Sequence, residues 1–88
     1  MKIKDGFILR PFEDQFIAIA TDAVPSLQNA LIVMSSSGAY VWKLLQEDHT
    51  EQQLIEKIMR KYEVDRETAS RDLTAFLTAV EQAGILEK

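Results

Sequence analysis

The spacing of the apolar residues changes once along this chain, near residue 35. Before that point, short apolar runs at 7–10, 16–20 and 30–34 are rich in aromatic and β-branched residues, which is typical of strands. After it, apolar residues recur at the three- and four-residue spacing of helices. A single change of this kind predicts an α+β domain in which a three-stranded antiparallel sheet is followed by three helices.

Turn residues separate the three predicted strands. Residues 11–14, "PFED", are expected to connect the first two strands as a hairpin, and "TDAVPSLQN" at 21–29 breaks the pattern before the third. So few strands need a helical partner to cover their apolar face. Three helices beside such a sheet can pack in several ways, and a winged-helix-like arrangement is one of them.

The first predicted helix follows the third strand after a run of serines. Its apolar face is expected to consist of Val41, Leu44 and Leu45. Ser36 or Ser37 is expected to cap it, and Trp42 is expected to anchor the core.

The second and third predicted helices carry their own start and stop signals. Thr50 and Gln53 form a capping box, Asp65 is placed to cap the third helix, and Gly84 lies where a C-terminal cap belongs. The apolar positions of the second helix are Leu54, Ile55, Ile58, Met59 and Tyr62, and those of the third are Ala69, Leu73, Phe76, Leu77 and Val80.

Size and composition exclude several classes of protein. With 88 residues, the chain is expected to form one domain over 1–88. The lack of cysteine excludes disulfides and a cysteine nucleophile, and the formal net charge of −4 opposes binding to phosphate backbones. No run approaches the roughly 18 to 20 apolar residues of a membrane span, so a cytoplasmic protein is expected.

Groups that could carry out catalysis are few. His49, the only histidine, is interpreted as a solvated linker residue before the second helix. The negative charge of Glu51 interacts favourably with the positive N-terminal end of that helix. The segment "QEDHTE" has neither the alternating oxygen ligands nor the glycine of a calcium loop. We therefore expect no enzyme activity, no metal and no cofactor.

The third strand and the third helix hold the features that remain unexplained. Ala30, Ile32 and Met34 alternate with Leu31 and Val33, so both faces of the strand are apolar although it is the edge of its sheet. Either the helices or a second copy of the chain covers this edge, or it receives an extended peptide by strand addition. Beside the core face of the third helix runs a strip of mostly small residues: Asp72, Ala75, Phe76, Ala79 and Ala83.

The order of motifs resembles the PqqD family. It runs from about Gly6 to Leu86 through "GFILRP", "SSGAYVWKLLQEDHTEQQLIEKI", "YEV" and "RDLTAFLTAVEQAGIL". This resemblance implies a winged-helix-like peptide chaperone, or precursor-peptide recognition element, that binds the leader of a ribosomally synthesised precursor and docks on a radical SAM maturase. It places the peptide on Leu31, Ile32, Val33 and Met34, with Asp72, Ala75, Phe76 and Ala79 opposite, and it implies no link to pyrroloquinoline quinone itself.

Two other functions compete with peptide recognition. A winged-helix DNA-binding regulator is favoured by the cations Arg60, Lys61, Arg66 and Arg71, although acidic residues of the third helix would repel phosphates. A structural homodimer would occupy the edge strand with its own copy.

Overall fold

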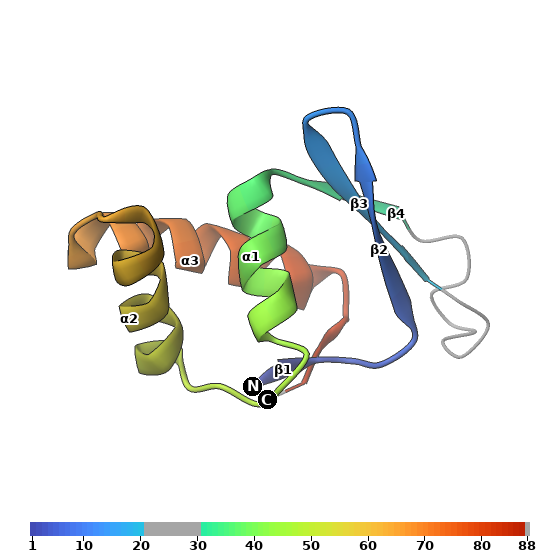
Figure 1. The fold of residues 1–88 in the computed structure, drawn as a ribbon. Coiled ribbons are helices and arrows are strands. Elements are labelled where there is room, and N and C mark those ends of the chain that lie inside the picture. Colours follow the sequence, from blue (N-terminus) through green and yellow to red (C-terminus); the bar gives the residue numbers. More distant parts are fainter. Residues whose placement is uncertain (21–30, 88) are drawn as a thin grey trace.

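The computed structural model describes residues 1–20 and 31–87 (Figure 1). Its strands are β1 (Lys2–Ile3), β2 (Phe7–Phe12), β3 (Gln15–Ala20), β4 (Leu31–Met34) and β5 (Leu86–Glu87), and its helices are α1 (Ser36–Leu44), α2 (Glu51–Tyr62) and α3 (Arg66–Gln82). The predicted α+β architecture, with a three-stranded antiparallel sheet before three helices, is confirmed. The turn expected at 21–29 and the strand position of Ala30 lie outside the described residues.

The three-stranded sheet has the order β2-β3-β4. Its hairpin is tighter than predicted, because Pro11 and Phe12 belong to β2 and pair with Phe16 and Gln15. Only Glu13 and Asp14 form the turn, with Glu13 at φ 57°. Pro11 is tolerated because its pair with Phe16 follows the hydrogen-bonded pair Phe12–Gln15, so its nitrogen faces away from β3. No described strand pairs with β2 on that side, and the missing N–H therefore costs no ladder hydrogen bond.

Helix α1 starts directly where β4 ends. Its N-cap is Ser35, whose Oγ accepts a hydrogen bond from the Gly38 backbone N–H at 3.3 Å. The prediction of Ser36 or Ser37 as the cap is therefore wrong. The extended backbone of β4 continues through Ser35, so the first serine is the last residue with the non-helical conformation that a cap requires.

The caps of α2 and α3 follow the sequence signals. Thr50 and Gln53 form both hydrogen bonds of the capping box, and Asp65 accepts from the Thr68 backbone N–H at 2.8 Å. At the end of α3, Gly84 has φ 77° and the Ile85 N–H donates to the Val80 carbonyl at 3.1 Å. This is the hydrogen bond of a Schellman motif, in which glycine adopts the left-handed conformation without strain.

A second, two-stranded sheet joins the segments near the two ends of the described chain (Figure 1). In it β1 pairs with β5, with Ile3 opposite Leu86, and the Ile3 N–H donates to the Leu45 carbonyl at 2.8 Å. Sequence periodicity does not predict this ribbon, because two residues are too few to show a period.

The core lies around α1, which has the β2-β3-β4 sheet on one side and α2 on the other (Figure 1). Trp42 is buried and meets the Phe7 ring edge to face, with centroids 5.6 Å apart. The other buried residues of the cluster are Ile3, Ala18, Met34, Ala39, Val41, Leu45, Leu54, Ile55, Ile58, Ala69, Leu73, Val80 and Ile85. Of the helices in the described part of the chain, none has the length and apolar character that crossing a membrane requires.

Candidate functional site

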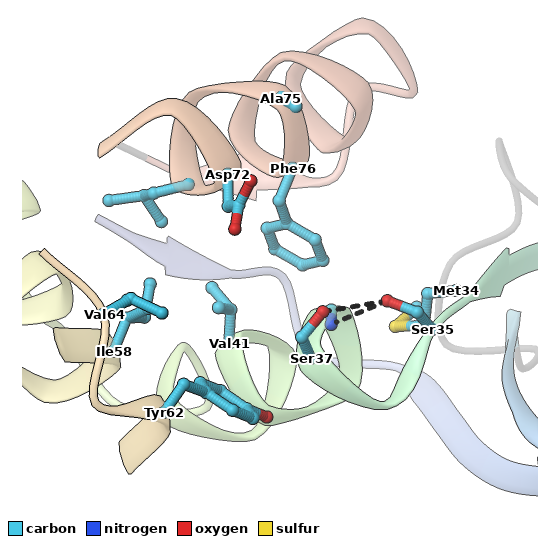
Figure 2. A pocket seen from close by; sticks show the side chains of 12 residues that line it. Met34, Ser35, Ser37, Val41, Ile58, Tyr62, Val64, Asp72, Ala75 and Phe76 are labelled. Carbon is cyan, nitrogen blue, oxygen red and sulfur yellow. Dashed lines mark hydrogen bonds between the residues drawn. The ribbon is translucent and has the colours of Figure 1, made fainter. Parts of the chain in front are cut away.

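A pocket of about 590 Å³ opens where β4 passes into α1 (Figure 2). Four segments line it: the end of β4 with the first turns of α1, the second half of α2, the connection from α2 to α3, and the middle of α3. The lining residues are Met34, Ser35, Ser37, Gly38, Val41, Ile58, Tyr62, Val64, Asp72, Leu73, Ala75 and Phe76.

Gly38 sets the distance between the β4 side of the pocket and α3. A Cβ atom at this position would lie 3.2 Å from Met34 Cβ and 3.5 Å from Phe76 Cδ2. Beside it, the Ser35 and Ser37 hydroxyls are 3.0 Å apart and hydrogen bonded to each other. The lack of a side chain at Gly38 thus lets the α1 backbone, Met34 and the Phe76 ring meet at one point.

Helix α3 contributes the opposite wall. Ala75 and Phe76 lie three and four residues after Asp72, which places all three on the same side of the helix. Leu73 is buried beneath them. Figure 2 shows the Asp72 carboxylate and the half-buried Phe76 ring both reaching from α3 toward the α1 side. This wall combines an apolar surface with one carboxylate at its rim.

The end of the pocket farthest from β4 is formed by Ile58, Tyr62 and Val64. The Tyr62 ring meets the Tyr40 ring edge to face at 5.8 Å, and Lys61 Nζ lies 5.5 Å from the centroid of Tyr40. Partial burial, and secondarily the neighbouring Tyr40, raise the pKa of Tyr62 above its ordinary value. The Tyr62 phenol is therefore a neutral hydroxyl at physiological pH.

The structure brings together four of the eight residues predicted to bind a peptide. Met34, Asp72, Ala75 and Phe76 line the pocket. The other four do not line it. Ile32 and Val33 precede Met34 in β4, and Ala79 is exposed one turn further along α3. The backbone of Leu31 pairs with that of Ile19, and its side chain lies outside the described part of the structure. Whether these residues bind a peptide stays a prediction.

Strand β4 has β3 as its only neighbour among the described strands. Its backbone groups on the other side are therefore in position to pair with an additional strand. Since β4 ends at the pocket, a segment that pairs with β4 would pass the pocket mouth. No described helix pairs with this edge, although α1 contacts the strand.

Sequence reasoning missed part of this pocket. Val41 and Ile58 are buried core positions as predicted, Tyr62 is exposed instead of buried, and Val64 had no assigned role; all four also line the cavity. Helical periodicity identifies a face that is buried, but it does not separate residues that fill a core from residues that line a hollow beside it.

The junction before α2 differs from the expected solvated linker. His49 is partly buried, its Nε2 lies 2.8 Å from Lys57 Nζ, and its backbone N–H donates to the Met1 carbonyl at 3.0 Å. The Met1 ammonium hydrogen-bonds Asp48 Oδ1 at 2.6 Å and holds the pKa of that carboxyl below its usual range. The contacts made by Met1 join residues almost fifty positions apart, which periodicity does not reveal. Among residues 1–20 and 31–87, no group of His, Cys, Asp and Glu is arranged to hold a metal ion.

Comparisons with known proteins agree with this architecture. The fold is a winged-helix-like α+β domain in which β4 is an edge strand among the described strands, and the family model described as coenzyme PQQ synthesis protein D (PqqD) matches residues 21–86. The chain belongs to the PqqD family, as its motifs led us to expect. Recognition elements of this type are non-catalytic proteins.

A solved structure supports the same assignment. The chain is similar to TbiB1, solved in complex with the TbiA(beta) leader peptide, with 28% sequence identity and a TM-score of 0.75. The alignment covers 99% of this chain and 95% of that one. No curated protein matches the sequence.

Proposed function

We propose that this chain is a non-enzymatic peptide chaperone that binds the leader of a ribosomally synthesised precursor and presents the precursor to a modifying enzyme. The observation that carries the proposal is the edge of β4 that no described strand pairs with, beside a pocket walled by α3. Membership of the PqqD family and the similarity to TbiB1, solved with a leader peptide, support it.

The leader binds as an additional strand along β4. Backbone hydrogen bonds to the strand edge supply affinity for any extended segment, and side-chain pockets supply selectivity. A bulky apolar side chain of the leader enters the pocket beside Phe76, while Asp72 at the rim favours a cationic or hydroxyl group nearby. The proposed peptide-binding residues are Leu31, Ile32, Val33, Met34, Asp72, Ala75, Phe76 and Ala79.

The modifying enzyme is proposed to be a radical SAM maturase. The support is the family membership, since PqqD proteins work with biosynthetic enzymes of precursor maturation. The chain itself acts as one domain in the cytoplasm, where the precursor is synthesised, and contributes binding and positioning instead of chemistry.

The test is a titration with the leader of any short peptide encoded near the gene of this chain, followed through backbone amide shifts. Shifts are expected at residues 31–34 and along α3. Phe76→Ala should weaken binding, because it removes a pocket wall, whereas Thr78→Ala, an exposed change on the same helix, should leave it unchanged. Shifts that avoid both β4 and α3 would show that the proposed seat is wrong.

A further inference from the structure

The face of the β2-β3-β4 sheet that is turned away from α1 is apolar and exposed. Side chains alternate along a strand, and Phe7 contacts Trp42 of α1, so the next residue of β2 points to the opposite face. Exposed fractions there are 44% for Ile8, 54% for Phe12, 38% for Ile19 and 52% for Val33. We call Ile8, Arg10, Phe12, Ile17, Ile19 and Val33 the outer sheet face.

The strand register makes these side chains one continuous patch. Ile8 lies opposite Ile19, and in the next row Arg10 lies opposite Ile17, which lies opposite Val33. Directly paired residues on one face of a sheet touch one another. Outside this face, Tyr62 in the pocket is the only large hydrophobic residue of the described part of the chain with a comparable exposed fraction. Apolar patches of this kind mark surfaces that bind other proteins.

The charge of the patch indicates what kind of protein binds it. The chain carries fourteen acidic residues and a net charge of −4, yet the outer sheet face contains no acid and one cation, Arg10. Arg10 forms no ion pair within the described residues. If two copies packed these faces together, each would bury Arg10 against a surface without a carboxylate, and a buried unpaired charge is strongly unfavourable. A different protein that supplies a carboxylate fits better.

We infer that the outer sheet face docks the modifying enzyme, through an apolar enzyme surface that bears a carboxylate opposite Arg10. This inference rests on the proposed function. Val33 belongs both to the outer sheet face and to β4, and a leader strand added to β4 would place alternate side chains on this face beside Val33. The enzyme therefore contacts the chain and the bound leader together, so it binds the loaded chain more tightly than the empty one.

The experiment uses a purified radical SAM enzyme and the leader of a short precursor, each chosen from those encoded near the gene of this chain. Calorimetric titration measures enzyme affinity for the leader-loaded chain and leader affinity for the chain alone. The double change Ile8→Thr with Ile19→Thr keeps β-branched side chains, and we expect it to weaken enzyme binding at least about tenfold. Leader affinity should change by less than about twofold, because neither residue belongs to the proposed peptide seat.

Charge reversal provides an independent arm. Arg10→Glu should also weaken enzyme binding at least about tenfold, whereas Arg60→Glu, a matched reversal at an exposed position of α2, should not. If the double variant loses leader binding as well, it is misfolded, and Arg10→Glu decides the question.

Two results would overturn the inference. One is enzyme binding that none of these outer-face changes affects. The other is a wild-type homodimer that the double change dissociates, which would assign the face to a second copy. Failure of the wild-type chain to bind leader is a separate result, because it contradicts the proposed function and is read from the leader titration alone.

Discussion

At Gly38 the α1 backbone comes close to both Met34 of β4 and Phe76 of α3. In Gly38→Ala the added Cβ meets Met34 Cβ at 3.2 Å, so Met34 must shift by a few tenths of an ångström, while the Phe76 ring at 3.5 Å stays in ordinary van der Waals contact. Replacing a helical glycine by alanine favours the helix by up to about 1 kcal/mol, which offsets the crowding. We expect the free energy of unfolding to change by less than about 1 kcal/mol and leader affinity to fall several-fold, measured by urea denaturation and calorimetry.

Ser36→Ala is the matched control for Gly38→Ala. Ser36 lies in the same helical turn, is exposed, and neither lines the pocket nor caps the helix. Equal losses of leader affinity in the two variants would show that the first turn of α1, and not the space at Gly38, controls binding.

The cap of α3 predicts a pH dependence of stability. Hydrogen bonds from the Thr68 side chain and backbone lower the pKa of Asp65 below its ordinary value. A carboxyl whose pKa is lowered by folding stabilises the protein above its unfolded pKa of about 3.9, and that stabilisation is lost as pH falls through the lower folded value. In Asp65→Asn, which caps without titrating, this part of the acid destabilisation should be absent. If the unfolding free energies of the two proteins changed with pH along parallel curves, the titration of Asp65 would not contribute to the acid destabilisation.

Among the elements, the short β1-β5 ribbon is expected to contribute strongly to stability. Ile3 is almost completely buried, and its backbone bonds link the ribbon to the end of α1. Ile3→Ala removes buried methyl groups and leaves a cavity, so we expect a loss of about 2–4 kcal/mol in unfolding free energy by urea denaturation. Ile8→Ala, at an exposed strand position, is the comparison and should cost much less. Similar losses would mean that the ribbon does not hold the core.

The elements also show what the sequence could and could not predict. Helix α2 was predictable because Thr50 and Gln53 satisfy each other locally and the apolar period continues through the helix. The ribbon and the pocket were not, since both depend on contacts between distant segments. Val64 shows the difference: it is one apolar residue in a short connection, and it acquires a role only because α1 and α3 place their side chains beside it.

For the whole molecule, the arrangement of charge opposes the DNA-binding alternative. In a DNA-binding winged helix the recognition helix presents cations to the phosphates. Here the exposed residues of α3 include Glu67 and Asp72 together with Arg66 and Arg71, and the total charge is −4. Attraction and repulsion of DNA phosphates nearly cancel along this helix. The net negative charge of the whole chain adds further repulsion.

We therefore expect no binding to random-sequence duplex DNA even at about 50 mM salt, where electrostatic attraction to phosphates is strong. The measurement is fluorescence anisotropy of a labelled duplex titrated with this chain. Asp72→Lys together with Glu67→Lys changes the charge of α3 by four units, and this variant is the positive control: any DNA affinity that it gains should fall steeply as salt rises. Salt-sensitive binding by the wild-type chain would revive the regulator hypothesis.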